Sequence, residues 1–166
     1  MTTFAFPSIT PATNTFELVS NTRTYQSPLT NAVQTASRKG SLWKASLQFN
    51  NLSGDDRKVM QAFLVKLNGQ QHRFTLQDHS HTLRGAGGGN LVVNGASQSG
   101  TTLVCNGATA NVNNYLREGD YVSFNNELHM VVADTNSDGS GNVSISIAPP
   151  IRKSPPDDTI VDYTAP

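Results

Sequence analysis

The sequence predicts a mainly β protein, in which a β-sandwich packs on one α-helix and a small β-barrel-like module is inserted or appended. Three observations predict this fold class. Apolar residues alternate with polar ones over residues 43–49, recur at helical spacing over residues 53–67, and form short runs between turn residues from residue 91 onward. We therefore expect a β-sandwich and helix domain over residues 1–83, completed by 149–166, and the small β-module over 84–148.

The low charge of the chain limits its partners. Charged residues make up 14% of the sequence, well below the roughly 25% usual for soluble domains. Twelve basic and twelve acidic residues cancel, so no long-range field steers the chain toward nucleic acid or anionic lipid, and self-association is not opposed. No segment approaches the ~18 apolar residues of a membrane span. We expect neither sequence-specific nucleic-acid binding nor membrane insertion.

The first forty residues are rich in Thr, Asn and Ser, with scattered apolar positions. We expect two or three short strands in this segment, interrupted by Pro7, Pro11 and Pro28, because proline cannot donate to a strand ladder. The backbone of such short strands needs partners, which a neighbouring subunit can supply.

The clearest pattern is a strand, a helix and a second strand over residues 43–76. Strict alternation over 43–49 predicts a half-buried strand, and residues 72–76 alternate in the same way. Ser53 is a suitable N-cap with Asp56 three residues later, and Gly69 follows the last apolar helical position. The residues predicted to form the core are Trp43, Leu47, Phe49, Val59, Phe63, Leu67, Phe74 and Leu76.

A glycine-rich segment, LRGAGGGN at residues 83–90, separates this part from the rest. Beyond it we expect five short strands and no helix, which is typical of a small closed or sandwiched β-module. Asn125-Asn126 suits a tight hairpin turn, because Asn tolerates positive φ. The single cysteine, Cys105, lies in the apolar run 103–105 and is expected to be buried. The predicted strands are residues 91–93, 101–105, 121–124, 128–133 and 143–147.

Two polar clusters are candidate metal sites, and both have simpler interpretations. Asp134, Asn136 and Asp138 match the first half of an EF-hand loop, but Ile145 stands where the loop's bidentate acid belongs. We interpret this segment as a hairpin turn, with an incidental weak calcium site as the alternative.

The second cluster is Asp78, His79 and His81, where two histidines two residues apart would share one face of a strand. The sequence specifies no fourth ligand, so a polar loop is the preferred interpretation. We expect no metal and no other cofactor. No nucleophile-base pattern and no pair of carboxylates on adjoining strands is present, so we expect no enzyme activity.

The order of these motifs resembles that of a known family. The run YQSPLTNAVQTASRKGSLWKASLQFNNLSGDDRKVMQAFLVKLNGQQHRFTLQD is similar to the N-terminal region of distal tail proteins of long-tailed, siphovirus-type bacteriophages. The similarity continues in the second half and covers about residues 25–162. The matching features are Ser27-Pro28, Gly40 before Trp43, residues 62–64 and 67–69, Phe74, residues 93–96 and 98–100, Leu116, Gly119-Asp120, Leu128, Val131, and Gly141 before residues 149–152.

The resemblance implies a structural virion protein. Six copies would form a hexameric ring that joins the tail tube to the tail tip, or baseplate, and its host-binding apparatus, leaving a lumen for the genome. The implied partners are other copies of the chain and further tail proteins, namely tail-tube, tape-measure and hub or tip proteins. Its place would be the tail of the virion, assembled in the host bacterial cytoplasm. A further strand or two after residues 159–166 is also implied.

Two other functions stay open at this stage. One is a tail-tube, terminator or accessory baseplate subunit, because these share a sheet-and-helix plan. The other is a carbohydrate-binding host-adhesion module that exposes Tyr115, Tyr121 and Phe124. In a ring, we expect the first forty residues and an arm over residues 84–90 to touch adjacent subunits.

Overall fold

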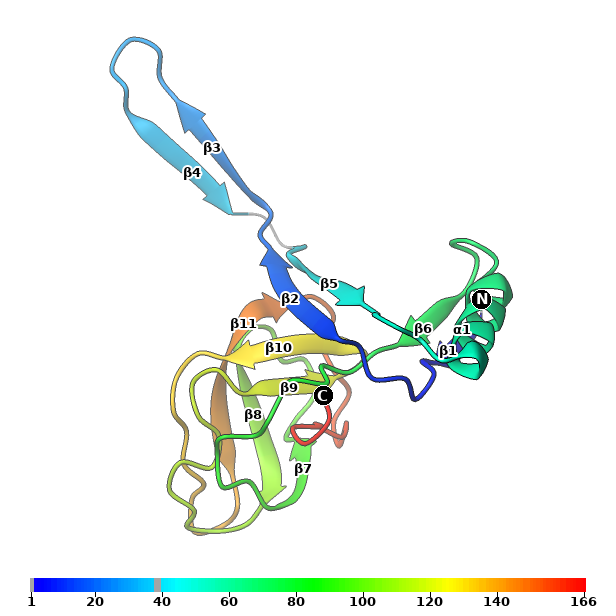
Figure 1. The fold of residues 1–166 in the computed structure, drawn as a ribbon. Coiled ribbons are helices and arrows are strands. Elements are labelled where there is room, and N and C mark those ends of the chain that lie inside the picture. Colours follow the sequence, from blue (N-terminus) through cyan, green and yellow to red (C-terminus); the bar gives the residue numbers. More distant parts are fainter. Residues whose placement is uncertain (1, 38–39) are drawn as a thin grey trace. The chain divides into compact units, whose positions relative to one another are not determined.

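The computed structural model describes residues 2–37 and 40–166 (Figure 1). The described chain is mainly β with one helix, as the sequence predicts. It divides into two compact units. Unit 1 comprises Met1–Phe16 and Ala45–Ser80, and unit 2 comprises Glu17–Lys44 and His81–Pro166.

Unit 1 is built around helix α1, Gly54–Leu67. Ser53 caps the helix, because its Oγ accepts a hydrogen bond from the Asp56 N–H at 3.1 Å, as the sequence predicts. The helix ends at Asn68, which adopts the left-handed conformation, and Gly69 follows with a φ of 67°. Strand β1, Thr3–Ala5, pairs in parallel with β6, Arg73–Thr75.

The predicted core positions of unit 1 are covered unequally. Phe63 and Leu67 are buried, the rings of Phe6 and Phe74 pack on Phe63, and Phe49 stacks on Phe6. Val59 is 51% exposed and Phe74 is 42% exposed, so neither is the core residue that the periodicity predicted. The physical reason is that β1 and β6 make too small a sheet to cover the apolar stripe of α1. The remaining predicted core positions are half-buried, namely Trp43, Leu47, Phe49 and Leu76.

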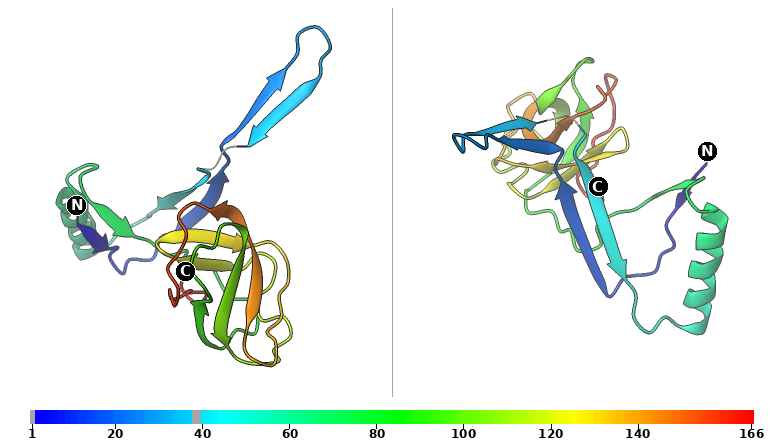
Figure 2. Two further views of the ribbon diagram at one scale, coloured as in Figure 1. Left: turned by 180° about the vertical axis from the view of Figure 1, so that it is seen from behind. Right: turned by 90° about the horizontal axis from the view of Figure 1, so that it is seen from above.

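Two further strand pairs replace the expected β-sandwich. Strand β2, Thr13–Val19, pairs with β5, Leu42–Gln48. Strand β3, Thr22–Gln26, pairs antiparallel with β4, Val33–Ser37, in a long hairpin that Figure 2 shows from two sides. The segment before residue 40 therefore holds four strands, and each of its sheets has two strands only.

Unit 2 contains a curled antiparallel sheet in the order β7, β8, β11, β10, β9. All five strands lie where the turn signals predicted them, and Asn125 and Asn126 form the β9–β10 turn with φ of 52° and 60°. The strands are β7 at Gly89–Val93, β8 at Gly100–Ala108, β9 at Tyr121–Phe124, β10 at Glu127–Val131 and β11 at Val143–Ile151.

The C-terminal segment closes this sheet. Val161 N–H donates to Leu91 O of β7 at 2.9 Å, and Ser123 N–H of β9 donates to Asp162 O at 2.7 Å. The segment thus lies between the two edge strands, with bridges Val92–Ile160 and Ser123–Asp162. Residues 149–166, expected to complete the first domain, instead belong to unit 2.

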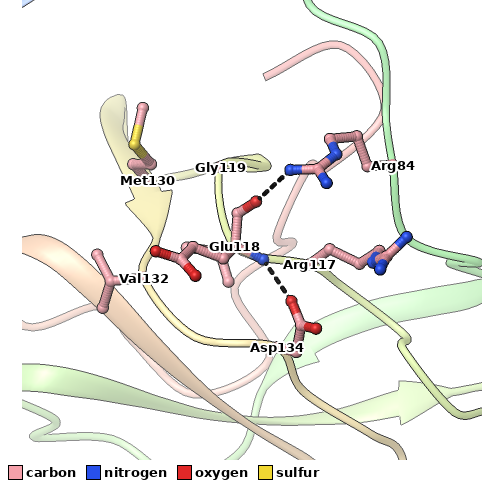
Figure 3. A pocket seen from close by; sticks show the side chains of 8 residues that line it. Arg84, Arg117, Glu118, Gly119, Met130, Val132 and Asp134 are labelled. Carbon is pink, nitrogen blue, oxygen red and sulfur yellow. Dashed lines mark hydrogen bonds between the residues drawn. The ribbon is translucent and has the colours of Figure 1, made fainter.

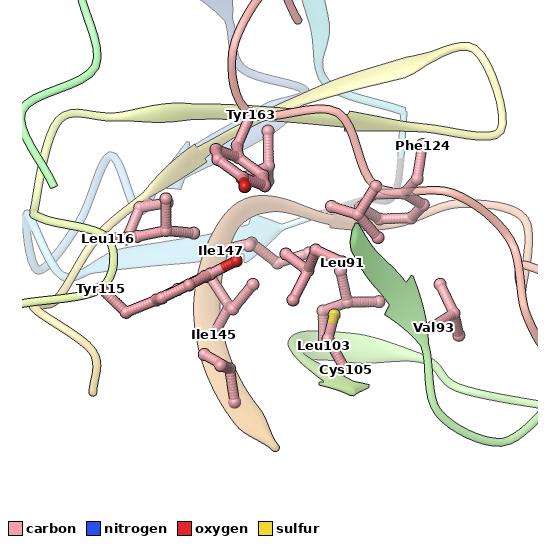
Figure 4. Packing of buried hydrophobic residues seen from close by; sticks show 14 of the residues in the cluster. Leu91, Val93, Leu103, Cys105, Tyr115, Leu116, Phe124, Ile145, Ile147 and Tyr163 are labelled. Carbon is pink, nitrogen blue, oxygen red and sulfur yellow. The ribbon is translucent and has the colours of Figure 1, made fainter. Parts of the chain in front are cut away.

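The main core of the described chain fills this closed sheet (Figure 4). Side chains from all five strands converge there, and Tyr115, Leu116, Val161 and Tyr163 join them from the connecting segments. Cys105 is fully buried, as expected from its apolar run. The closed sheet of unit 2 therefore has a complete hydrophobic core, whereas unit 1 has an incomplete one.

The glycine-rich segment is tied to its own module. Tyr163 Oη donates to Gly89 O at 3.0 Å, and Tyr115 Oη donates to Gly88 O at 2.7 Å. A Cβ at Gly85 would clash with the Tyr115 carbonyl oxygen, so the glycine is needed for this close approach. Residues 84–90 are thus not the free arm that we expected. Among the described residues, no helix has the length and apolar character needed to cross a membrane.

Candidate functional site

The β3–β4 hairpin is the most exposed strand pair of the described chain. Every residue of β3 is exposed, and Leu29 at the tip is 94% exposed. The turn is held by Ser27 N–H, which donates to Ala32 O at 2.9 Å, and by Asn31 at a φ of 53°. An isolated two-stranded hairpin is marginally stable in water at best. This hairpin therefore offers backbone edges and apolar side chains for which the described chain provides no cover.

Helix α1 presents a second uncovered apolar surface. Val65 is 80% exposed, and Val59 and Leu64 are each more than half exposed. Only Phe63 and Leu67 of this helix are buried. A unit of about fifty residues is close to the size at which a single core becomes marginal, even when that core is complete. We define Val59, Leu64, Val65 and Phe74 as the α1 surface.

Within unit 2, an aromatic contact connects Trp43 to the closed sheet. Trp43 Nε1 donates to Leu128 O at 2.8 Å, and the Trp43 ring packs edge-on against Tyr121 with centroids 5.4 Å apart. His81 packs on Tyr121 at 5.2 Å in the same manner. The Leu128 carbonyl belongs to strand β10, so β5 is connected to the closed sheet by a directional contact as well as by apolar packing.

An open groove of about 450 Å³ lies on unit 2 (Figure 3). Arg84 Nη1 donates to Glu118 O at 2.8 Å, and Glu118 N–H donates to Asp134 Oδ1 at 2.8 Å. Positive and negative side chains thus share the groove, and its other lining residues are small or apolar. The lining comprises Arg84, Arg117, Glu118, Gly119, Met130, Val131, Val132 and Asp134. This mixture gives no preference for an anionic or cationic ligand.

Asp120 lies beside this groove as a fully buried carboxylate. It accepts backbone N–H bonds from Arg84 at 2.8 Å, Gly85 at 3.0 Å and Arg117 at 2.8 Å. Three donors compensate for the burial of one charge. The carboxylate fixes the start of the glycine-rich segment to the turn before β9. In the sequence, Gly119-Asp120 stood out only as one of the features shared with distal tail proteins, and nothing pointed to this role.

The first metal candidate is a turn in which every named oxygen accepts a backbone N–H. Asp134 binds Glu118 N–H, Asn136 Oδ1 binds Asn114 N–H at 2.7 Å, and Asp138 Oδ1 binds Asn142 N–H at 2.8 Å. Hydrogen bonds from the Asn142 side chain and from backbone N–H groups lower the pKa of Asp138. The bonds of Asp134 and Asn136 link the 112–118 loop to the 134–142 loop, and those of Asp138 hold the second loop itself.

The second candidate is divided between the units. Asp78 Oδ1 accepts Asn14 Nδ2 at 2.6 Å and Ser80 N–H at 2.9 Å within unit 1, where His79 is exposed. His81 belongs to unit 2 and packs on Tyr121. Within residues 2–37 and 40–166, no group of three or more His, Cys, Asp or Glu residues is placed to hold a metal ion.

A buried polar cluster around His129 was not visible in the sequence. The imidazole stacks on Phe124 with centroids 4.6 Å apart, and its Nδ1 lies 2.8 Å from Pro149 O. Glu127 lies 3.7 Å from His129 Nε2 and 3.4 Å from Arg152 Nη2. The sequence pattern favours the opposite face of β10 for the core, because Leu128, Met130 and Val132 alternate as apolar residues, whereas the buried positions are His129 and Val131.

The thiol of Cys105 is not reactive inside the core of unit 2. Burial raises the pKa of the Cys105 thiol to about 12.

No protein-family model matches this chain, and no curated protein matches it. The features that remain as candidates are therefore surfaces: the hairpin, the α1 surface and the open groove.

Proposed function

We propose that this chain is a structural protein that assembles with copies of itself into a closed ring. The observation that carries the proposal is the contrast between the two parts of the fold. The closed sheet of unit 2 has a complete core and both of its edges covered, whereas the hairpin and the α1 surface expose apolar side chains and strand edges.

The proposed partner of these surfaces is a second copy of the chain. The hairpin edge is a general template for strand addition, and the α1 surface exposes apolar side chains that a partner could cover. The two surfaces differ from one another, so a contact between them is heterologous, and repeating a heterologous contact closes a ring when the rotation permits. A formal net charge of zero leaves little repulsion between copies.

The resemblance to distal tail proteins gives this ring its biological setting. On that basis we assign the ring to the tail of a long-tailed bacteriophage, as a hexamer between the tail tube and the tip or baseplate. Its other partners would be tail-tube, tape-measure and hub or tip proteins. The support from this chain is the order of the motifs over residues 25–162, together with a mainly β fold with one helix.

The alternative of a carbohydrate-binding module is less well supported. It needs aromatic side chains on the surface of the second module. Tyr115 and Phe124 are buried in its core, and Tyr121 is covered by Trp43 and His81. These three residues therefore do not form an exposed platform of the kind that stacks on sugars.

A matched pair of variants tests the proposed contact. Leu29→Asp places a charge at the hairpin tip, and Ile160→Asp places one at another exposed apolar position, 76% exposed, in the C-terminal segment. We expect Leu29→Asp to yield monomers with unchanged circular dichroism, because a buried unpaired charge opposes docking. Ile160→Asp should keep the assembly. Light scattering gives the mass of each variant, and equal loss of assembly in both would contradict the assignment of the hairpin.

A further inference from the structure

Three Asn-Gly pairs occur in the chain: Asn68-Gly69, Asn94-Gly95 and Asn106-Gly107. This dipeptide can react with itself. The glycine nitrogen gives its proton to solvent base and attacks the asparagine Cγ. The Nδ2 group takes a proton from solvent, its bond to Cγ breaks, and it departs as ammonia, so that a cyclic succinimide remains. Water then opens either carbonyl of the ring and yields aspartate or isoaspartate. The reaction needs a free glycine N–H and a backbone that can rotate toward the side chain.

The Asn94-Gly95 pair lacks the free nitrogen. Gly95 N–H donates to Asp157 Oδ1 at 2.7 Å. Asn94 N–H donates to Val104 O at 2.9 Å, and Asn94 O accepts Gln98 Nε2 at 2.9 Å, so the backbone on both sides is held. The attacking group is engaged and the chain around it is fixed.

The Asn106-Gly107 pair lacks the freedom to rotate. It lies inside β8, where Asn106 is paired with Val92 of β7. A Cβ at Gly107 would clash with the Asn90 carbonyl oxygen, which shows how closely the neighbouring strand approaches. Reaction at this pair requires the sheet to open locally.

The Asn68-Gly69 pair keeps its attacking nitrogen free, although Asn68 itself is held in the turn, because its N–H donates to Val65 O at 3.0 Å, its carbonyl accepts the Gln71 N–H at 3.3 Å and its Nδ2 donates to Gln71 Oε1. Both residues are exposed, and a Cβ at Gly69 would have no neighbour within 4 Å. Among the hydrogen bonds of the described residues, none has the Gly69 N–H as its donor. We propose that Asn68 is a site of spontaneous deamidation in the folded chain, and that Asn94 and Asn106 are protected by the structure.

The modification would act on helix α1. Asn68 is the C-cap, and its N–H donates to Val65 O at 3.0 Å. Aspartate or isoaspartate adds a negative charge at the negative end of the helix dipole. Isoaspartate also lengthens the backbone within the left-handed cap. Leu67, one of the two buried residues of the helix, lies directly before the modified position. Deamidation of Asn68 therefore destabilises the C-terminal end of helix α1, which carries the α1 surface.

Peptide mapping by mass spectrometry after incubation at mildly alkaline pH tests this assignment. In the folded protein, Asn68 should deamidate at least about tenfold faster than Asn94 and Asn106, because local opening limits the two protected sites. In denaturant, the three sites should react at similar rates, because the dipeptide is the same. Similar rates in the folded protein would overturn the proposal.

Two variants test the cause of the protection at Asn94. Asp157→Ala removes the acceptor of the Gly95 N–H and should speed deamidation of Asn94 several-fold without changing Asn68. Asp157→Asn keeps a side-chain oxygen at that position and should leave both rates unchanged. If Asp157→Ala leaves Asn94 as slow as before, the hydrogen bond is not what protects it, and this part of the argument fails.

Discussion

The surroundings of the buried residue His129 constrain its charge. The imidazole is 1% exposed, and burial lowers its pKa below the ordinary value of 6.5, although the hydrogen bond to Pro149 and the nearby Glu127 carboxylate act in the opposite direction. The Arg152 guanidinium adds to the lowering. His129 is therefore neutral in the folded chain over a wider pH range than in the unfolded chain.

This difference predicts an acid-sensitive fold. The unfolded chain takes up the proton as the pH falls through about 6.5, and the folded chain does so only at lower pH, so stability is full above that value and declines below it. We expect the free energy of unfolding of unit 2, measured by urea titration, to fall between neutral and mildly acidic pH. His129→Gln should reduce this decline. An unchanged decline in the variant would show that other groups cause it.

Residue-scale features were predictable where one residue's own pattern decides the outcome. The burial of Cys105 and the cap at Ser53 follow from the neighbouring residues in the chain. The roles of Asp120 and His129 could not be predicted, because their partners Arg84 and Pro149 are distant in sequence and come close only after the sheet has closed.

At the scale of elements, helix α1 depends on very few buried side chains. Phe63 packs against Phe6 and Phe74, and Leu67 is the other buried position. Phe63→Ala should therefore destabilise unit 1 by about 3–5 kcal/mol. Val65→Ala, at an 80% exposed position of the same helix, should change stability by less than about 0.5 kcal/mol in the unassembled chain. Thermal melts followed by circular dichroism at the helix signal compare the two, and equal melting temperatures would contradict this packing.

The glycine-rich segment allows a similar comparison. A Cβ at Gly85 would meet the Tyr115 carbonyl oxygen and Leu116 Cα, whereas a Cβ at Gly54 would meet nothing within 4 Å. We expect Gly85→Ala to cost roughly 1–3 kcal/mol through overpacking. Gly54→Ala should be neutral or stabilising, because alanine favours helix. Chemical denaturation measures both, and a neutral Gly85→Ala would mean that the segment does not pack closely on its module.

Helices and strands whose apolar residues repeat at a clear interval were predictable from the sequence. Strands that are held by pairing with residues far away in the sequence were not. Alternation found β5, helical spacing found α1, and turn residues found the five strands of the curled sheet. The parallel pair of β1 with β6 and the closure by residues 158–162 join segments far apart in the chain. Short polar strands such as β3 have no apolar face to reveal them.

At the scale of the whole molecule, both candidate metal clusters serve as turns, so metal removal should have no effect. The oxygens of Asp134, Asn136 and Asp138 already accept hydrogen bonds, and Asp78 binds Asn14 and Ser80. We expect chelator treatment to leave the melting temperature and the oligomeric state unchanged. A loss of stability that calcium or zinc restores would establish a site at one of these clusters.

The closed sheet of unit 2 has a complete hydrophobic core, whereas unit 1 leaves apolar side chains exposed. The sequence predicted a small β-module after the glycine-rich segment, but it assigned the C-terminal residues to the other domain. Composition could not show this, because Val161 and Tyr163 acquire their place only through contact with the distant residues Leu91 and Gly89.

In the proposed ring, neighbouring copies cover the hairpin and the α1 surface of each subunit. Electron microscopy of the purified full chain, with the particle mass measured on the same sample, would show this arrangement. We expect closed rings of uniform size, hexameric if the resemblance to distal tail proteins holds, with residues 22–37 of each copy lying against the next. A uniform monomer in which the hairpin and α1 surface stay uncovered or fold back on their own chain would contradict it.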